Sequence, residues 1–370
     1  MFFYLFTLTI LAFVTACSSF SPLSELPATS HFTLEPSSTL EPSATPEPTS
    51  TSTDTPRPTA TLTSSPTAIK ILNNVVGRIK YHKIDGADIY NYYSYIPRNL
   101  DFSKKIQIVI SPAEGQCKEC CDVEIASNNV KYHMEGYLHY ADKYNFVLLF
   151  PVIHNNCDGL RDNWTLHFPD FVFSDPVDST FYRPDLKLNA SIDNFKASLV
   201  NDGLIVDDKV YIFGFSIGGL ASNKYSILQP SYVSAFAAGG TAGDLCFPVD
   251  SIDGYPLNWA WGTNNFESLV GTTFNQEEYN KISQFLFFGD KDFNNYHLQE
   301  SCNLGGTDAC HWKNFWGSDM VSAFSNQCKF LQDLGLEVTC KLYPDKAHEF
   351  NDEMINDVFE FFHEIRSNNN

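Results

Sequence analysis

Residues 210–225, VYIFGFSIGGLASNKY, place a serine among glycines at the point where an apolar, strand-like run changes to a helical pattern. Gly214 and Gly218 stand two residues before and two residues after Ser216. A strand that turns abruptly into a helix brings its backbone too close for side chains, so glycine is favoured at both places. The pattern predicts a strained turn that holds the Ser216 hydroxyl exposed at the end of a strand.

Apolar runs of strand length alternate with longer amphipathic segments from about residue 70 onward. The runs expected to be strands lie at 75–84, 87–97, 105–112, 146–153, 209–215, 232–239, 283–290 and 337–344. Helical patterns lie near 123–144, 190–203, 217–228, 317–334 and 350–366. Apolar runs separated by helices are typical of a mostly parallel sheet that is covered on both faces. We therefore expect a single α/β domain with a central sheet of about eight strands.

The N-terminal part of the chain has a different composition. Residues 1–17 form an apolar run ending in Val-Thr-Ala-Cys, which resembles the bacterial lipobox and makes Cys17 the expected lipid attachment site. Residues 18–68 are rich in Ser, Thr, Pro and Glu without apolar periodicity, which predicts a disordered linker. The domain at 69–370 would then be exported and tethered to a bacterial membrane. A plain cleaved signal or an uncleaved short anchor is the alternative, because the usual basic residue before the apolar run is absent from the sequence.

The charge balance argues against one class of partner. The chain has 44 acidic residues against 24 Lys and Arg, which gives a formal net charge of −20 at pH 7. Such a chain repels a phosphate backbone, and its sequence contains no basic stripe. We therefore expect no nucleic acid partner.

Cysteine usage points to an oxidising compartment. The chain has ten cysteines, and nine remain if Cys17 carries a lipid, which favours disulfide bonds with one thiol left over. The local pairs expected first are Cys328 with Cys340 and Cys302 with Cys310. The spacing Cys117-Lys-Glu-Cys120 has no second motif of its kind at zinc-finger distance, so we expect no metal site.

Two further segments carry the groups that a serine nucleophile needs. A serine hydroxyl requires a base that takes its proton, and the base requires a carboxylate that orients it. The run FLFFGDKD places Asp290 and Asp292 just past a strand, and His348 follows the next strand shortly before a helix. Functional groups of such sheets lie beyond the carboxyl ends of the strands. Asp290 and Asp292 compete as the acid, and the turn spacing favours Asp292.

This arrangement resembles the α/β-hydrolase superfamily, whose nucleophile lies in a Gly-x-Ser-x-Gly elbow and whose triad runs Ser, Asp, His along the chain. Within that superfamily, residues 201–243 are similar to exported polyhydroxybutyrate depolymerases and to feruloyl or acetylxylan esterases, and the similarity covers roughly residues 105–365. The resemblance implies an α/β-hydrolase fold in which Ser216 is the nucleophile, Asp292 the acid and His348 the base. It implies no cofactor.

Hydrogen-bond donors to the oxyanion are the remaining requirement. The backbone N–H of Ile217 stands at the expected helix N-terminus, directly after the elbow serine. The resemblance places a second donor in a His-Gly loop after the third strand, where this chain reads Ser-Pro-Ala-Glu-Gly at 111–115. Pro112 has no N–H to donate, so we expect the backbone N–H of Ala113 or Glu114 to serve.

Aromatic side chains near the strand ends are candidates for substrate binding. The resemblance places Trp164, which follows the strand at 146–153, near the cleft, although core packing is an equal alternative. Four further tryptophans fall in segments that interrupt the α/β alternation: Trp259, Trp261, Trp312 and Trp316. They form either a lid or glycan platform, or a buried satellite cluster.

These expectations combine into a lipid-tethered serine esterase that acts outside the cytoplasm through an acyl-Ser216 intermediate. Its substrate would be a feruloyl or acetyl ester of a polysaccharide, or a hydroxyalkanoate polyester, because a long tether suits an insoluble polymer. Two alternatives stay open at this point. One is a serine peptidase of the same fold, and the other is a surface carbohydrate-binding or adhesion protein on a hydrolase fold that has lost turnover.

Overall fold

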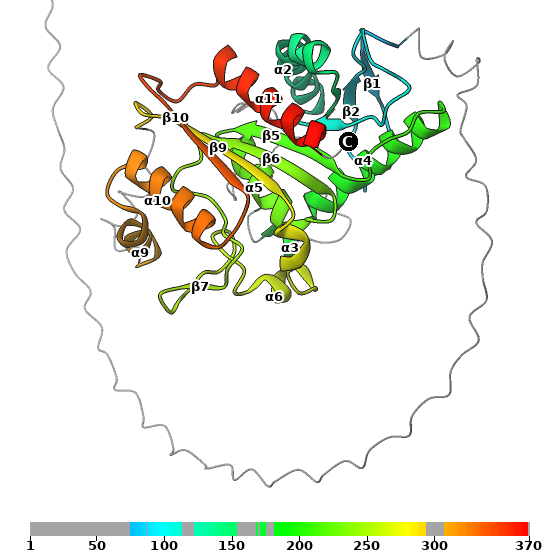
Figure 1. The fold of residues 1–370 in the computed structure, drawn as a ribbon. Helices are drawn as coiled ribbons and strands as arrows, with labels where there is room; N and C mark the ends of the chain where they lie inside the picture. Colours follow the sequence, from blue (N-terminus) through cyan, green and yellow to red (C-terminus); the bar gives the residue numbers. More distant parts are fainter. Residues whose placement is uncertain are drawn as a thin grey trace, which may run out of the picture. The chain divides into compact units, whose positions relative to one another are not determined.

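An eight-stranded sheet is the central layer of the computed structural model (Figure 1). Its strands lie in the order β1-β2-β4-β3-β5-β6-β9-β10. Their bounds are β1 Ile79–His82, β2 Tyr92–Tyr95, β3 Ile108–Ile110, β4 Val147–Pro151, β5 Val210–Phe215, β6 Val233–Gly239, β9 Ser283–Gly289 and β10 Val338–Tyr343. The structure describes residues 75–86, 88–112, 122–153, 168, 171–174, 181–293 and 307–368.

The strand directions follow the expected alternation of strands and helices. β1 pairs antiparallel with β2, and β2 pairs antiparallel with β4. The neighbours β4-β3-β5-β6-β9-β10 are all parallel. Parallel neighbours need crossover connections, and the helical segments between the strands supply them. The predicted α/β-hydrolase fold, a mostly parallel sheet with helices on both faces, is confirmed.

Helices and two short strands complete the described fold. Their bounds are α2 Val123–Tyr144, α3 Phe171–Ser174, α4 Pro184–Asn201, α5 Ile217–Leu228, β7 Ser251–Ile252, β8 Tyr255–Pro256, α6 Phe266–Val270, α7 Gln276–Tyr279, α9 Thr307–Trp316, α10 Met320–Asp333 and α11 Asp352–Asn368. The predicted helices at 123–144 and 217–228 match α2 and α5. No helix or strand was predicted for residues 240–282, which contain the β7–β8 hairpin, α6 and α7. These elements have two to five residues each and are too short for a periodic signal.

The two faces of the sheet bury two separate hydrophobic layers. In β5, Tyr211 and Phe213 face a layer that includes side chains of α2 and α11. Val210 and Ile212 of the same strand face a layer that includes side chains of α4, α5 and α10. Successive side chains of a strand point to opposite faces, so β5 is apolar throughout because both faces are covered. Figure 1 shows α2 and α11 on one side of the sheet and α5 and α10 on the other.

One of the two expected disulfide bonds is present in the structure. Cys328 in α10 is bonded to Cys340 in β10, with Cα atoms 6.3 Å apart and a sequence separation of 12. The other expected pair, Cys302 with Cys310, lies outside the described side chains.

Cys246 is a buried free thiol, and burial raises its pKa to about 12, so it stays protonated at neutral pH.

Several expectations for the N-terminal part fall on residues that the structure does not describe. The signal at 1–17, the acylated Cys17 and the linker at 18–68 all lie outside the described residues. Within residues 75–368 and their gaps as given above, no helix combines the length and apolar character that a bilayer crossing requires. The described residues all belong to the unit Thr61–Asn370.

The disulfide generates a stability prediction. The double variant Cys328→Ala/Cys340→Ala should lower the free energy of unfolding by roughly 3 kcal/mol, because the bond closes a loop of about 12 residues in the unfolded chain. Urea unfolding followed by tryptophan fluorescence measures the change. The matched control is Ser325→Ala/Thr339→Ala, which alters exposed positions of the same helix and strand and should stay within about 0.5 kcal/mol. Equal unfolding midpoints for the two double variants would contradict the prediction.

Candidate active site

The elbow serine occupies a backbone conformation that few residues other than glycine adopt. Ser216 lies between the last residue of β5, Phe215, and the first residue of α5, Ile217. Its φ is 53° and its ψ is −120°. Side chains rarely tolerate this region, and strain of this kind costs roughly 1–3 kcal/mol. The predicted sharp strand-to-helix turn is therefore present at Ser216.

Glycine is required around Ser216 because the backbone closes on itself. A Cβ atom on Gly214 would lie 2.2 Å from the carbonyl carbon of Gly218. A Cβ atom on Gly219 would lie 2.8 Å from the carbonyl oxygen of Gly239 in β6. The backbone N–H of Ser216 donates to that same oxygen over 2.7 Å, which ties the elbow to the neighbouring strand. Side chains at these glycines would force the elbow open.

Within the described part of the chain, the Ser216 side chain does not cap the N-terminus of the helix that follows the elbow. Among the described residues, Ser216 makes no capping hydrogen bond to the N-terminus of α5, while its carbonyl accepts from Leu220 N–H over 3.0 Å. The Ser216 hydroxyl is thereby kept out of helix capping. Ile217 is the first residue of this helix of 12 residues, so its N–H belongs to the positive end of the helix dipole.

The structure brings His348 and Asp292 into direct contact. His348 Nδ1 and Asp292 Oδ2 are 2.7 Å apart. The Asp292 side chain is 2% exposed and the His348 side chain 28%. An ionised carboxylate only accepts hydrogen bonds. His348 Nδ1 therefore keeps its proton and donates a hydrogen bond to Asp292. A neutral His348 then has its unprotonated nitrogen at Nε2, which is the tautomer that a general base needs.

Asp290, the competing acid, is placed differently. Its backbone N–H donates to the carbonyl of Tyr343 over 3.0 Å, which joins the ends of β9 and β10. Its Oδ1 is buried and has no hydrogen-bond partner within the part of the chain that the structure describes. The described contacts therefore pair His348 with Asp292 and not with Asp290.

Backbone contacts hold the acid loop against the histidine loop. A Cβ atom on Gly289 would lie 2.3 Å from the carbonyl oxygen of Lys346. The backbone N–H of Lys291 donates to that same oxygen over 2.8 Å. Gly289 thus allows the loop after β9 to reach the loop after β10, which explains why the Gly-x-x-Asp spacing places Asp292 beside His348.

Ser216 and His348 both lie next to the end of β6. Ser216 N–H bonds the carbonyl of Gly239, and a Cβ atom on Gly240 would lie 3.1 Å from Cε1 of His348. The Phe215 ring, one residue before the serine, has its centroid 4.8 Å from that of the His348 ring. The two predicted catalytic residues therefore flank the same Gly239–Gly240 backbone. Sequence reasoning did not single out this glycine pair, although the run Ala-Ala-Gly-Gly after a strand was its visible signal.

Some sequence-predicted site residues cannot be placed. The structure does not describe Ala113 and Glu114, which were expected to supply the second oxyanion donor, or Trp164, which was expected to bind substrate.

Trp312 and Trp316 are 2% and 3% exposed and contact Phe247, as expected for a buried cluster. Within the described residues, no group of three or more His, Cys, Asp or Glu side chains is arranged to hold a metal ion.

A serine–histidine hydrogen bond joins His82 of β1 to Ser94 of β2, with Nε2 and Oγ 2.8 Å apart. Burial lowers the pKa of His82 to about 4, so its ring is neutral at physiological pH. Ser94 is buried within a strand and adopts no elbow conformation. A hydroxyl in that position is screened from substrate, so this pair stabilises the sheet edge.

The elbow contacts generate a paired prediction. Gly214→Ala should lower the free energy of unfolding by about 2 kcal/mol, because its methyl group overlaps the Gly218 backbone. Gly136→Ala, at an exposed position of α2 with no atom within 4 Å of the added methyl group, should raise it by about 0.5–1 kcal/mol. Thermal and urea unfolding of both variants measure the difference. A Gly214→Ala protein as stable as the Gly136→Ala protein would show that the elbow is more open than described.

No protein-family model matches the sequence, and no curated protein matches it. Solved structures similar to this chain include poly(aspartic acid) hydrolase-1 from Sphingomonas sp. KT-1, with 14% identity over 78% of this chain and 98% of that one and a TM-score of 0.49. A poly(3-hydroxybutyrate) depolymerase from Bordetella parapertussis has 14% identity, coverage of 82% and 93%, and a TM-score of 0.47. The feruloyl esterase module from Clostridium thermocellum has 16% identity, coverage of 84% and 90%, and a TM-score of 0.37.

The fold assignment rests on this chain's own topology. Antiparallel β1 and β2 stand at one edge, parallel strands follow, and the elbow connects β5 to α5. These features together are those of an α/β-hydrolase fold.

Proposed function

We propose that this protein is a serine hydrolase that cleaves carboxylic esters. The observation that carries the proposal is the partly buried Asp292–His348 hydrogen bond of 2.7 Å, at a strand end next to the strained Ser216 elbow. An oriented histidine that takes the proton of a serine hydroxyl converts a weak nucleophile into a reactive one. The three residues come from the loops after β5, β9 and β10, which the parallel register brings to one edge of the sheet.

The reaction follows from the roles of these side chains. Ser216 Oγ attacks the ester carbonyl carbon while His348 Nε2 takes the hydroxyl proton, and Asp292 stabilises the imidazolium that forms. The tetrahedral intermediate collapses, the C–O bond to the leaving alcohol breaks, and His348 returns the proton to that alcohol. Water then attacks the acyl-Ser216 ester with His348 again as the base, which releases the acid and restores the serine. The sequence of steps needs no cofactor.

Stabilisation of the oxyanion is assigned to backbone donors. Ile217 N–H at the start of α5 is the first, because the helix N-terminus carries partial positive charge. The second proposed donor is the N–H of Ala113 or Glu114, which follow β3 in the sequence, and β3 pairs with β5. Trp164 is proposed to contact the substrate.

The substrate class follows from the sequence resemblance and from the tether. We assign the activity to feruloyl or acetyl esters of a polysaccharide, or to hydroxyalkanoate polyesters. Acylation of Cys17 and an extended linker at 18–68 would place the catalytic domain outside the cytoplasm, at the membrane surface and within reach of an insoluble polymer.

Ser216→Ala should abolish hydrolysis of p-nitrophenyl acetate, with a rate loss of roughly 10⁴-fold or more, because no nucleophile remains. The same variant should no longer react with a fluorophosphonate probe, while its melting temperature stays close to that of the parent. Ser94→Ala is the matched control, because it removes a serine hydroxyl that is hydrogen-bonded to His82 and lies away from the elbow, and it should keep labelling. Retained activity in Ser216→Ala would end the proposal. Hydrolysis of aminoacyl p-nitroanilides but not of esters would point to a peptidase.

The acid is tested by a second pair of variants. Asp292→Asn should lower kcat by roughly 10⁴-fold, because the amide cannot hold His348 in the required tautomer. Asp290→Asn should have a much smaller effect, because the described contacts of Asp290 do not include the imidazole. Steady-state ester hydrolysis measures both variants. A large loss at Asp290 with little loss at Asp292 would reverse the assignment.

A further inference from the structure

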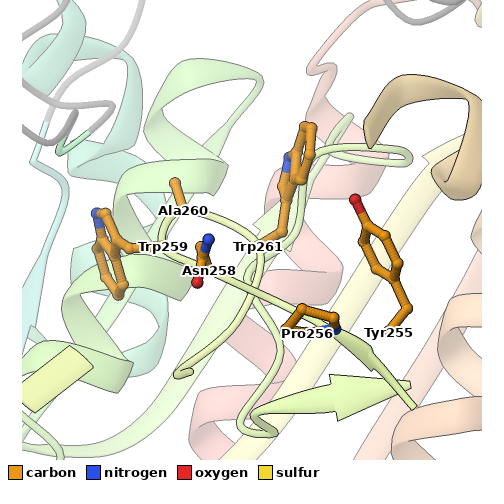
Figure 2. A pocket seen from close by; sticks show the side chains of 6 residues that line it. All are labelled: Tyr255, Pro256, Asn258, Trp259, Ala260 and Trp261. Carbon is orange, nitrogen blue, oxygen red and sulfur yellow. The ribbon is translucent and has the colours of Figure 1, made fainter. Parts of the chain in front are cut away.

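A pocket of about 390 Å³ lies in the segment between β6 and β9, and none of its described lining residues belongs to the proposed triad. The lining residues are Tyr255, Pro256, Asn258, Trp259, Ala260 and Trp261 (Figure 2). Every one of these side chains is uncharged. The volume is in the range of small-molecule sites, which is roughly 300–1,000 Å³. We call this cavity the Trp261 pocket.

The turn that forms the pocket is held by its own backbone. The carbonyl of Asn258 accepts from Trp261 N–H over 2.9 Å and from Gly262 N–H over 3.0 Å. The backbone N–H of Trp259 donates to Asn265 Oδ1 over 2.7 Å. A Cβ atom on Gly262 would lie 2.4 Å from Leu257 Cβ, so the turn closes tightly. The pocket is therefore formed before any ligand arrives, which lowers the entropy cost of binding.

The two tryptophans of the pocket play different parts. Trp259 is 6% exposed, its indole N–H donates to the carbonyl of Phe168 over 2.6 Å, and its ring lies edge-on to Phe173. It forms a fixed wall. Trp261 is only half-buried and stacks on Trp312, with ring centroids 5.3 Å apart and an interplanar angle of 22°. One indole face of Trp261 is thus packed on Trp312, and Trp261 also lines the pocket.

Neutral polar side chains also line the pocket. Asn258 is exposed, and its Oδ1 accepts from Asn264 Nδ2 over 2.7 Å, which leaves its own Nδ2 group as a donor for another partner. In the view of Figure 2, Trp261 stands between Asn258 and the ring of Tyr255, whose hydroxyl is at the end nearer Trp261. The pocket therefore combines a flat aromatic surface with amide and hydroxyl groups and no charge.

We propose that the Trp261 pocket binds a neutral sugar ring. The C–H groups of a pyranose carry partial positive charge and pack on the negative face of an indole, while its hydroxyls exchange hydrogen bonds with amides and phenols. The uncharged lining and the net charge of −20 disfavour an anionic ligand. Binding of a sugar ring does not depend on the proposed function. Only the identity of the polymer that supplies the ring rests on the proposed esterase activity. If the ester is carried by a polysaccharide, the pocket holds a ring of that same polymer.

Binding can be tested without turnover. The full-length Ser216→Ala chain is titrated with xylotetraose and with cellotetraose, and heat and tryptophan fluorescence are recorded. Saturable binding of either sugar is expected. Adding Trp261→Ala should weaken it at least tenfold, whereas Trp261→Phe, which keeps an aromatic face, should retain most of the affinity. Tyr132→Ala, which removes an aromatic ring 74% exposed on α2, is the matched control and should leave binding unchanged.

The outcomes separate this inference from the proposed esterase. Sugar binding that depends on Trp261 supports the pocket even if the parent chain shows no ester hydrolysis. Failure of both sugars to bind, or equal affinity in Trp261→Ala and the parent, overturns it. Preferential binding of ferulate or of a 3-hydroxybutyrate trimer at Trp261 also overturns it, because the occupant would then be the acyl part and not the sugar. Circular dichroism confirms that each variant is folded. If Trp261→Ala is unstable, Trp261→Leu, which keeps apolar bulk but no aromatic face, takes its place and should weaken binding to the same extent.

Discussion

The close approach of backbone to backbone at the end of β5 is the constraint on which the rest of the site depends. Gly214 and Gly218 come so near that any side chain on the former would overlap the latter. This contact lets Ser216 sit at φ 53° with its hydroxyl free of the helix that follows. Strain of roughly 1–3 kcal/mol persists only where surrounding structure enforces it. Here a strand buried on both faces and the Ser216–Gly239 hydrogen bond provide that enforcement.

Parallel register then determines which loops meet the elbow. Phe215 pairs with Gly239, Gly239 with Phe287, and Gly289 with Tyr343, so the carboxyl ends of four adjacent strands lie along one edge. The loops after β9 and β10 are joined by backbone hydrogen bonds to Tyr343 and Lys346. These bonds fix the acid and the imidazole relative to each other before substrate arrives, and preorganisation of this kind is what makes electrostatic stabilisation effective. Burial of Asp292 shields the carboxylate side of its bond with His348 from water.

Much of this arrangement could be predicted from local signals in the sequence. Gly214 and Gly218 predicted the elbow, and the alternation of strands and helices predicted the sheet. The turn spacing after Gly289 favoured Asp292 over Asp290. Each of these signals lies within a few residues of the group that it positions. The Cys328–Cys340 bond was also within reach, because it joins a helix to the strand that directly follows it.

Other features depend on contacts between segments that are far apart along the chain, and such contacts produce no periodic pattern in the sequence. The elements at 240–282 are too short to show a pattern, so the hairpin and the Trp261 pocket could not be foreseen in detail. Some tryptophan rings are buried and others half-buried because of their contacts with Phe168, Phe247 and Trp312. These three residues come from separate parts of the chain. The role of Gly240 depends on His348, more than a hundred residues away along the chain.

A crystal structure of the chain after reaction with a fluorophosphonate tests the central claim most directly, because it reports the convergence of the three strand-end loops in a single observation. The account predicts phosphorus bonded to Ser216 Oγ, with His348 Nε2 within about 3.2 Å of an oxygen of the adduct and Nδ1 still bonded to Asp292. An unmodified Ser216, or a His348 ring directed away from the adduct, would contradict it.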